Sequence, residues 1–142
     1  MVATPNGTAQ VVCVIKNMIE GETKICELEN GLKITPGHPI MYNGEWRYPR
    51  EIVQPKVQGS TTVYNLVLDE HHMAIVNEVP VILLGHNYTE GILKHPYLGS
   101  QAVIRDLEML PGWDQGFIEI KGAWMKKTRG IKSINMDLFN NQ

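Results

Sequence analysis

The chain has 142 residues, of which 43% are hydrophobic and 20% charged, and its formal net charge is -2. This composition is typical of a soluble globular protein with one domain, or with one domain and a small appendage. The sequence contains no apolar run near the roughly 20 residues of a transmembrane segment, no signal-peptide pattern, and too few cysteines for a disulfide scaffold.

Short strand-like runs separated by turn signals dominate the chain as far as residue 86. Residues 10–16 and 23–28 are rich in Val, Ile and Cys and are predicted strands. Asn30-Gly31 predicts a two-residue hairpin into the run LKIT, and Asn43-Gly44 similarly separates PIMY from EWRY.

Residues 61–68 and 73–84 add two or three further strands. Because Pro and Gly rather than helices end these runs, we expect a mainly β fold, a meander of short antiparallel strands.

The pattern changes near Gly85. Apolar residues at helical spacing predict a helix over about residues 100–110, with Ser100 as N-cap and Pro111-Gly112 as the stop. FIEIK, residues 117–121, alternates like a strand, and residues 129–134 are a second candidate. We therefore expect a β core over 1–92 and a small α+β C-terminal extension over 93–142.

The run TPGHPI places Thr35 and His38 three residues apart in a turn stiffened by Pro36, Gly37 and Pro39. Such a turn aims one hydroxyl and one imidazole at the same place. A histidine titrates near neutrality and is suited to general acid or base catalysis.

The remaining histidines and the two cysteines offer weaker signals. His71 and His72 lie between two strands, and their spacing to His38 and His86 matches no familiar zinc site, so we predict neither metal nor cofactor. Cys13 and Cys26 lie within apolar strands, where a buried hydrophobic role is favoured over a nucleophile.

A basic cluster stands out against the negative net charge. Residues 121–132 carry five positive charges and no acid, whereas the rest of the chain carries a net charge of -7. The cluster with its tryptophan predicts an anion-binding surface, formed by Lys121, Trp124, Lys126, Lys127, Arg129 and Lys132. A solvated edge strand protected by lysines explains it as well. Nucleic acid is disfavoured, because five positive charges form a small patch on an acidic protein.

Three blocks of the sequence resemble a known family. GLKITPGHPI is similar to the TxxH block of Hint domains, the self-processing modules of hedgehog proteins and inteins. VYNLVLDEHHMAIVNEVPVILLGHN resembles their closing block, and HPYLGSQAVIRDLEMLPGWDQGFIEI resembles the extension of Vint domains, which follow von Willebrand factor A domains. The resemblance covers nearly the whole chain and implies a horseshoe-like Hint fold whose extension corresponds to an adduct recognition region.

The resemblance implies an autoprocessing reaction. A cysteine thiol attacks the preceding peptide carbonyl, and the N–S acyl shift yields a thioester that a further nucleophile resolves. His38 would protonate the leaving nitrogen, Thr35 would orient the scissile peptide, and His72 is a weaker candidate for assisting proton transfer. His86-Asn87 is similar to the pair that ends an intein, but Tyr88 follows, so we expect self-cleavage in a single turnover rather than splicing.

The family's nucleophile leads a strand several tens of residues before TxxH, and neither cysteine of this chain takes that place. We therefore expect the nucleophile segment to be supplied in cis or as a separate chain, and this chain to be inactive alone. The alternative is a binding module for a sulfated glycosaminoglycan or an anionic lipid.

Overall fold

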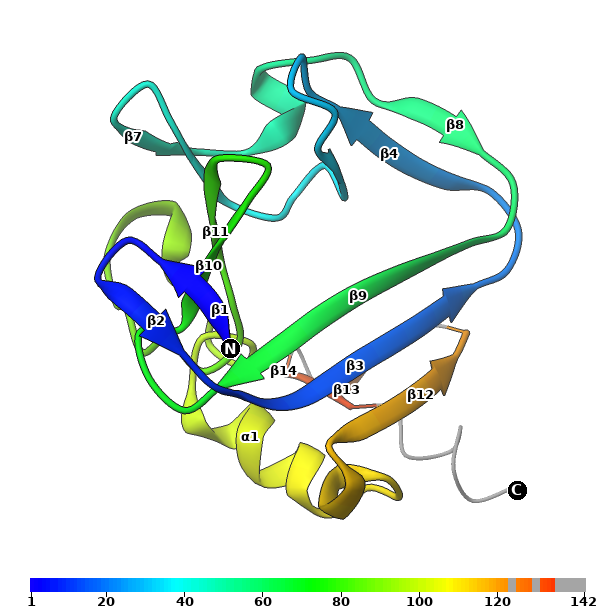
Figure 1. Cartoon of the computed structure of the whole chain (residues 1–142). Coiled ribbons are helices and arrows are strands. Elements are labelled where there is room, and N and C mark those ends of the chain that lie inside the picture. The colour runs from blue at the N-terminus through cyan, green and yellow to red at the C-terminus, as the bar shows by residue number, and fades with distance from the viewer. Residues whose placement is uncertain (123–124, 129–130, 135–142) are drawn as a thin grey trace.

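In the computed structural model, a set of small β-sheets surrounds the middle of the molecule, and one helix closes its lower side (Figure 1). The structure describes residues 1–122, 125–128 and 131–134. The strands are β1 Val2–Thr4, β2 Gly7–Ala9, β3 Val11–Ile19, β4 Thr23–Glu27, β5 Lys33–Ile34, β6 Ile40–Tyr42, β7 Glu45–Arg47, β8 Lys56–Gln58, β9 Thr61–Leu68, β10 Met73–Val76, β11 Val79–Ile82, β12 Phe117–Lys121, β13 Met125–Thr128 and β14 Ile131–Ile134. The helices are α1 Gln101–Glu108 and three 3₁₀ turns, Pro49–Glu51, Gly91–Leu93 and Trp113–Gln115. The expected mainly β, Hint-type fold is confirmed.

A tight hairpin forms at one of the two Asn-Gly turns that the sequence predicted. Asn43 and Gly44 both have positive φ, 52° and 81°, and join β6 to β7 in antiparallel register. The two-residue hairpin predicted at Asn30-Gly31 is wrong, because the last residue pair of β4 and β5 is Glu27 with Lys33 and, of the two turn residues, only Gly31 has a positive φ, 87°. A further turn at Asn77, also with positive φ, joins β10 to β11.

The predicted meander is wrong for the longest strands, because these pair with partners distant in the sequence. β3 and β9 form an antiparallel ribbon in which Ile19 lies opposite Thr61 and Val11 opposite Leu68. β12 adds to the other edge of β3 in parallel, with Phe117 opposite Val14. The resulting sheet has the order β12-β3-β9 and forms one long wall of the molecule (Figure 1).

The helix and this sheet share the main hydrophobic core. Ser100 caps the helix as predicted, since its hydroxyl accepts the N–H of Ala102 at 3.2 Å. The core residues come from both sides of residue 92: Cys13, Ile15, Val67, Leu84, Tyr97, Val103, Leu107, Leu110, Ile118 and Ile120. The packing of α1 on β3 and β12 therefore couples the C-terminal residues to the β unit.

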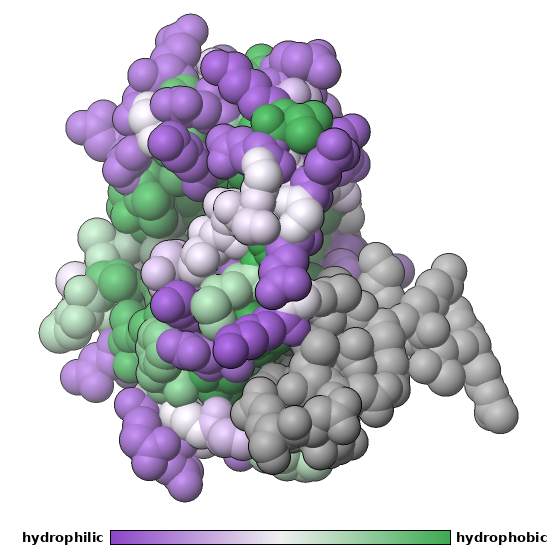
Figure 2. Space-filling view, turned by 90° about the vertical axis from the view of Figure 1, so that its right-hand side faces the viewer, coloured by the Kyte–Doolittle hydropathy of each residue, from purple (hydrophilic) through white to green (hydrophobic). Residues whose placement is uncertain are grey.

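A second core lies under the opposite arm. It gathers Cys26, Leu28, Leu32, Ile34, Ile40 and Val81, and so fixes the segment that leads into the TPGHPI turn. Viewed from the side of β4 and β8, hydrophilic side chains dominate the upper surface, and hydrophobic ones appear lower down (Figure 2).

Candidate functional site

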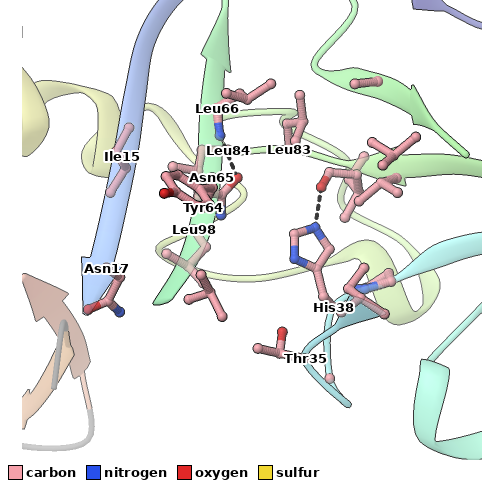
Figure 3. A pocket seen from close by; sticks show the side chains of 18 of the residues that line it. Ile15, Asn17, Thr35, His38, Tyr64, Asn65, Leu66, Leu83, Leu84 and Leu98 are labelled. Carbon is pink, nitrogen blue, oxygen red and sulfur yellow. Dashed lines mark hydrogen bonds between the residues drawn. The ribbon is translucent and has the colours of Figure 1, made fainter. Parts of the chain in front are cut away.

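A cavity of about 680 Å³ lies between β9 and the TPGHPI turn. About half of the residues that line it are leucine, isoleucine or valine, and Thr35 and His38 line it from the turn (Figure 3). Asn65 of β9 lies across the space from them, and Tyr64, the residue before it, also lines the cavity. A concave apolar site with a few polar groups is the usual form of a binding or catalytic site.

Backbone hydrogen bonds hold the TPGHPI turn in shape. The His38 N–H donates to the Thr35 carbonyl at 3.3 Å, and the Arg50 N–H donates to the Pro36 carbonyl at 3.2 Å. The guanidinium of Arg50 lies 4.2 Å from the centre of the Tyr48 ring, a cation–π contact. Sequence reasoning missed this support, because no motif links residues 48–50 to the turn.

The His38 ring is oriented by one short hydrogen bond. Its Nε2 lies 2.5 Å from the Ile82 carbonyl oxygen, and since a carbonyl only accepts, Nε2 carries the proton. The other ring nitrogen faces the cavity (Figure 3). Burial lowers the pKa of His38, and the hydrogen bond to Ile82 opposes that shift. The resting ring is therefore neutral, with its lone pair turned to the open space.

Thr35 lies in the same turn as His38, three residues before it, as the sequence predicted. It is half-buried, its carbonyl fixes the His38 backbone, and its hydroxyl points into the cavity (Figure 3). The structure therefore brings the threonine and the histidine to the same wall.

His72 lies elsewhere and is not among the residues that line the cavity. Both His71 and His72 have positive φ, 68° and 50°, in the turn before β10. The Nδ1 atom of His72 is buried and makes no hydrogen bond. Burial and the neighbouring His71 lower the pKa of His72, while Asp69 raises it.

Two histidines not selected from the sequence as catalytic do line the cavity, His86 and His95. Nδ1 of His86 accepts the N–H of Tyr88 at 2.9 Å, and Nδ1 of His95 accepts the N–H of Leu98 at 2.8 Å. Burial, then His72 and His95, lower the pKa of His86. Their Nδ1 atoms are engaged with the backbone, and within the described residues no group of three or more His, Cys, Asp or Glu is placed to hold a metal ion.

Neither cysteine lines the cavity. Cys13 and Cys26 are both 0% exposed, each in a different core, and burial raises the pKa of both thiols. Their Sγ atoms contact backbone carbonyls, that of Val14 at 3.7 Å and that of Val53 at 3.9 Å. Both therefore have the buried hydrophobic role that their apolar strands favoured.

The basic cluster lies partly within the described structure. Lys121 ends β12 and is exposed, Lys126 and Lys127 belong to β13, and Lys132 belongs to β14. In the hairpin register Lys127 lies directly opposite Lys132. Trp124 and Arg129 lie outside the described residues.

The fold and the cavity define a β domain with a rigid Thr–His turn at an apolar cavity. The sequence profile of the family described as Vint: Hint-domain matches residues 1–135. The chain belongs to the Vint family of Hint domains, as the three sequence blocks predicted, and it is a domain of the autoprocessing type. A comparison with curated proteins found no match. No helix in the described part of the chain is both long and apolar enough to cross a bilayer.

Proposed function

We propose that this domain catalyses an N–S acyl shift on a cysteine-led segment bound in the cavity, with His38 as proton carrier. The observation that carries the proposal is the fixed tautomer of His38, whose Nε2 is held by the Ile82 carbonyl while its other nitrogen faces the cavity. A neutral imidazole with a free lone pair is ready to accept a proton at neutral pH.

His38 alone accepts and returns the proton in this reaction. The cysteine thiol gives its proton to the free nitrogen of His38 as its sulfur bonds to the preceding carbonyl carbon. The imidazolium gives that proton to the amide nitrogen as the C–N bond breaks, leaving a thioester and an amine. Because burial lowers the pKa of His38, its protonated form is a stronger acid toward the poorly basic nitrogen. General acid–base catalysis of this kind contributes about 10²–10⁴ in rate.

Thr35 orients the scissile peptide in this scheme. Its hydroxyl donates to or accepts from a peptide group held against the turn, on the same wall as His38. The thiol itself comes from a segment joined in cis or supplied as a separate chain, because Cys13 and Cys26 are buried away from the cavity.

The test joins a reporter protein and the cysteine-led segment of another Vint-type domain to Met1, and measures reporter release with dithiothreitol. We expect thiol-dependent release that falls by about 10²–10⁴ in the His38→Ala variant. His71→Asn is the matched control, since His71 does not line the cavity and Asn tolerates its positive φ. Equal release from the parent fusion and from a fusion whose segment cysteine is replaced by alanine would sink the proposal.

We also propose an anion-binding role for the C-terminal hairpin. Lys127 lies directly opposite Lys132 in the β13–β14 register, so two residues of the basic cluster are neighbours in the hairpin. Elution from heparin should therefore move to lower salt in the double variant Lys127→Ala, Lys132→Ala. Unchanged elution relative to the control Lys33→Ala, on β5, would exclude this role.

A further inference from the structure

Strand β9 forms one edge of the sheet β12-β3-β9, and within the described residues β3 is its only partner. The hydrogen bonds on the other edge of β3 show how the backbone N–H and C=O groups of β9 are oriented. The Val14 N–H donates to the Gly116 carbonyl at 2.9 Å, and the Met18 carbonyl accepts the Gly122 N–H at 3.0 Å. The backbone groups of Val14 and Met18 therefore point toward β12 and away from β9.

Directly opposed residues of an antiparallel pair share one orientation, either toward each other or both outward. Leu66 lies opposite Val14, and Thr62 lies opposite Met18. Tyr64 lies two residues from each of them along β9, so its backbone groups have the same orientation as theirs. The N–H and C=O groups of Thr62, Tyr64 and Leu66 therefore point away from β3, to the open edge of β9.

A side-chain hydrogen bond supports this orientation independently. The Leu66 N–H donates to Oδ1 of its own neighbour Asn65 at 2.9 Å, which is the behaviour of a group without a strand partner. No backbone hydrogen bond to another loop or strand of the described chain involves Thr62 or Tyr64. A strand edge with unpaired N–H and C=O groups is a template on which another extended chain can pair.

This edge faces the catalytic cavity rather than a flat surface. Thr62, Tyr64 and Leu66 all line the same space as Thr35 and His38. The nearby Asn17, only 8% exposed, also lines it, and its Oδ1 is buried without a hydrogen-bond partner. A buried amide oxygen without a donor is destabilising, so the site is short of a hydrogen-bond donor.

We propose that the segment processed at His38 binds by strand addition, pairing its backbone with Thr62 and Tyr64 along the open edge of β9. The proposal rests on the function proposed above and specifies how its peptide is held. The occupant is an extended peptide, because donors and acceptors alternating every second residue match the backbone of another strand. Pairing ends before Leu66, whose N–H is already taken by Asn65.

Hydrogen exchange measured by NMR tests the binding mode directly. The probe is the synthetic cysteine-led segment of the fusion with its cysteine replaced by alanine, which binds without reacting. At a concentration about 100 times its Kd, exchange at the Thr62 and Tyr64 amides should slow by about 100-fold. The amides of Val63 and Asn65, which point toward β3, are the internal reference and should change much less.

A matched pair of variants at one position separates backbone from side chain. Tyr64→Pro removes the outward N–H and leaves the β3 ladder intact, as proline does at strand edges. Tyr64→Ala removes only the ring. We expect Tyr64→Pro to lose peptide binding and Tyr64→Ala to retain it. Should Tyr64→Pro fail to fold, a probe N-methylated at alternate residues removes the same hydrogen bonds from the peptide side and should not bind.

The outcomes separate this inference from the proposed function. Thiol-dependent release by the fusion with no protection at Thr62 and Tyr64 overturns strand addition and leaves the function standing. Protection by the probe, with no release from the fusion, supports strand addition and rejects the function. Protection that grows with protein concentration in the absence of probe means that a second copy takes the edge, which also overturns the inference.

Discussion

Gly112 is the position where one added methyl group tests the packing of the C-terminal segment most sharply. It follows Pro111, lies between the end of α1 and the 3₁₀ turn Trp113–Gln115, and has a φ of +98°. Its carbonyl accepts the N–H groups of Gln115 and Phe117, both at 3.0 Å. These bonds turn the chain into β12, so Gly112→Ala perturbs the point at which the HPY…GW segment returns to pair with β3.

The magnitude follows from the contacts that a Cβ would make. It would lie 2.0 Å from the Phe117 carbonyl oxygen, a backbone atom that moves only if the turn moves. The positive φ alone costs about 1–2 kcal/mol, and forced overpacking adds about 1–3 kcal/mol. Gly21→Ala isolates the first contribution, because Gly21 has a φ of +83° and nothing within 4 Å of its Cβ position.

Thermal unfolding followed by circular dichroism measures the difference between the two variants. For a chain of this size each kcal/mol lowers Tm by about 2–4 °C. We expect Gly112→Ala to unfold about 2–12 °C below Gly21→Ala. Equal Tm values for the two variants would refute the packing of this turn.

Three further outcomes are expected. Leu107→Ala leaves a cavity in the core between α1 and β3 and should lower the free energy of unfolding by about 2–5 kcal/mol, measured with a denaturant, in a single transition. Separate transitions for α1 and the β core would contradict the shared core. Because the folded-state pKa of His38 lies below its unfolded value, the unfolded state takes up more protons on acidification; the free energy of unfolding should fall as pH drops below about 6.5, less steeply in His38→Gln. An equally steep fall in the variant would show that other groups carry the effect. Cys13 and Cys26 should resist a thiol reagent until the chain unfolds, since both are fully buried with raised pKa values; rapid modification of the native protein would argue against that burial.

The local elements were predictable because local chemistry determines them. Asn43-Gly44 adopts the positive φ values of a tight hairpin, and Ser100 caps a helix whose apolar face is visible in the sequence. The strand at Phe117 was predicted too, but not its parallel pairing with β3. That pairing joins residues about a hundred positions apart and depends on the packing of α1, which hydrophobic periodicity does not encode.

The site divides in the same way. Thr35 and His38 were identified from a short motif, because both belong to one rigid turn. The Ile82 carbonyl that sets the tautomer of His38 comes from β11, and a backbone oxygen leaves no mark in the sequence. The open edge of β9 was equally hidden, since it is defined by the strand that β9 lacks.

The open edge and the rigid turn act on one peptide if strand addition holds. A strand bound to β9 would run about 4.8 Å from it, within the cavity that separates β9 from the turn. Every second residue of that strand would pair its N–H and C=O with β9, at Thr62 and Tyr64, and the N–H and C=O of the alternate residues would point the other way. Those alternate groups would face His38 and Thr35. Because the C=O and the N–H of one peptide group point to opposite edges of a strand, strand addition would hold one of these groups of the scissile bond on β9 and present the other to His38 and Thr35, and a one-residue slip of the strand would exchange them.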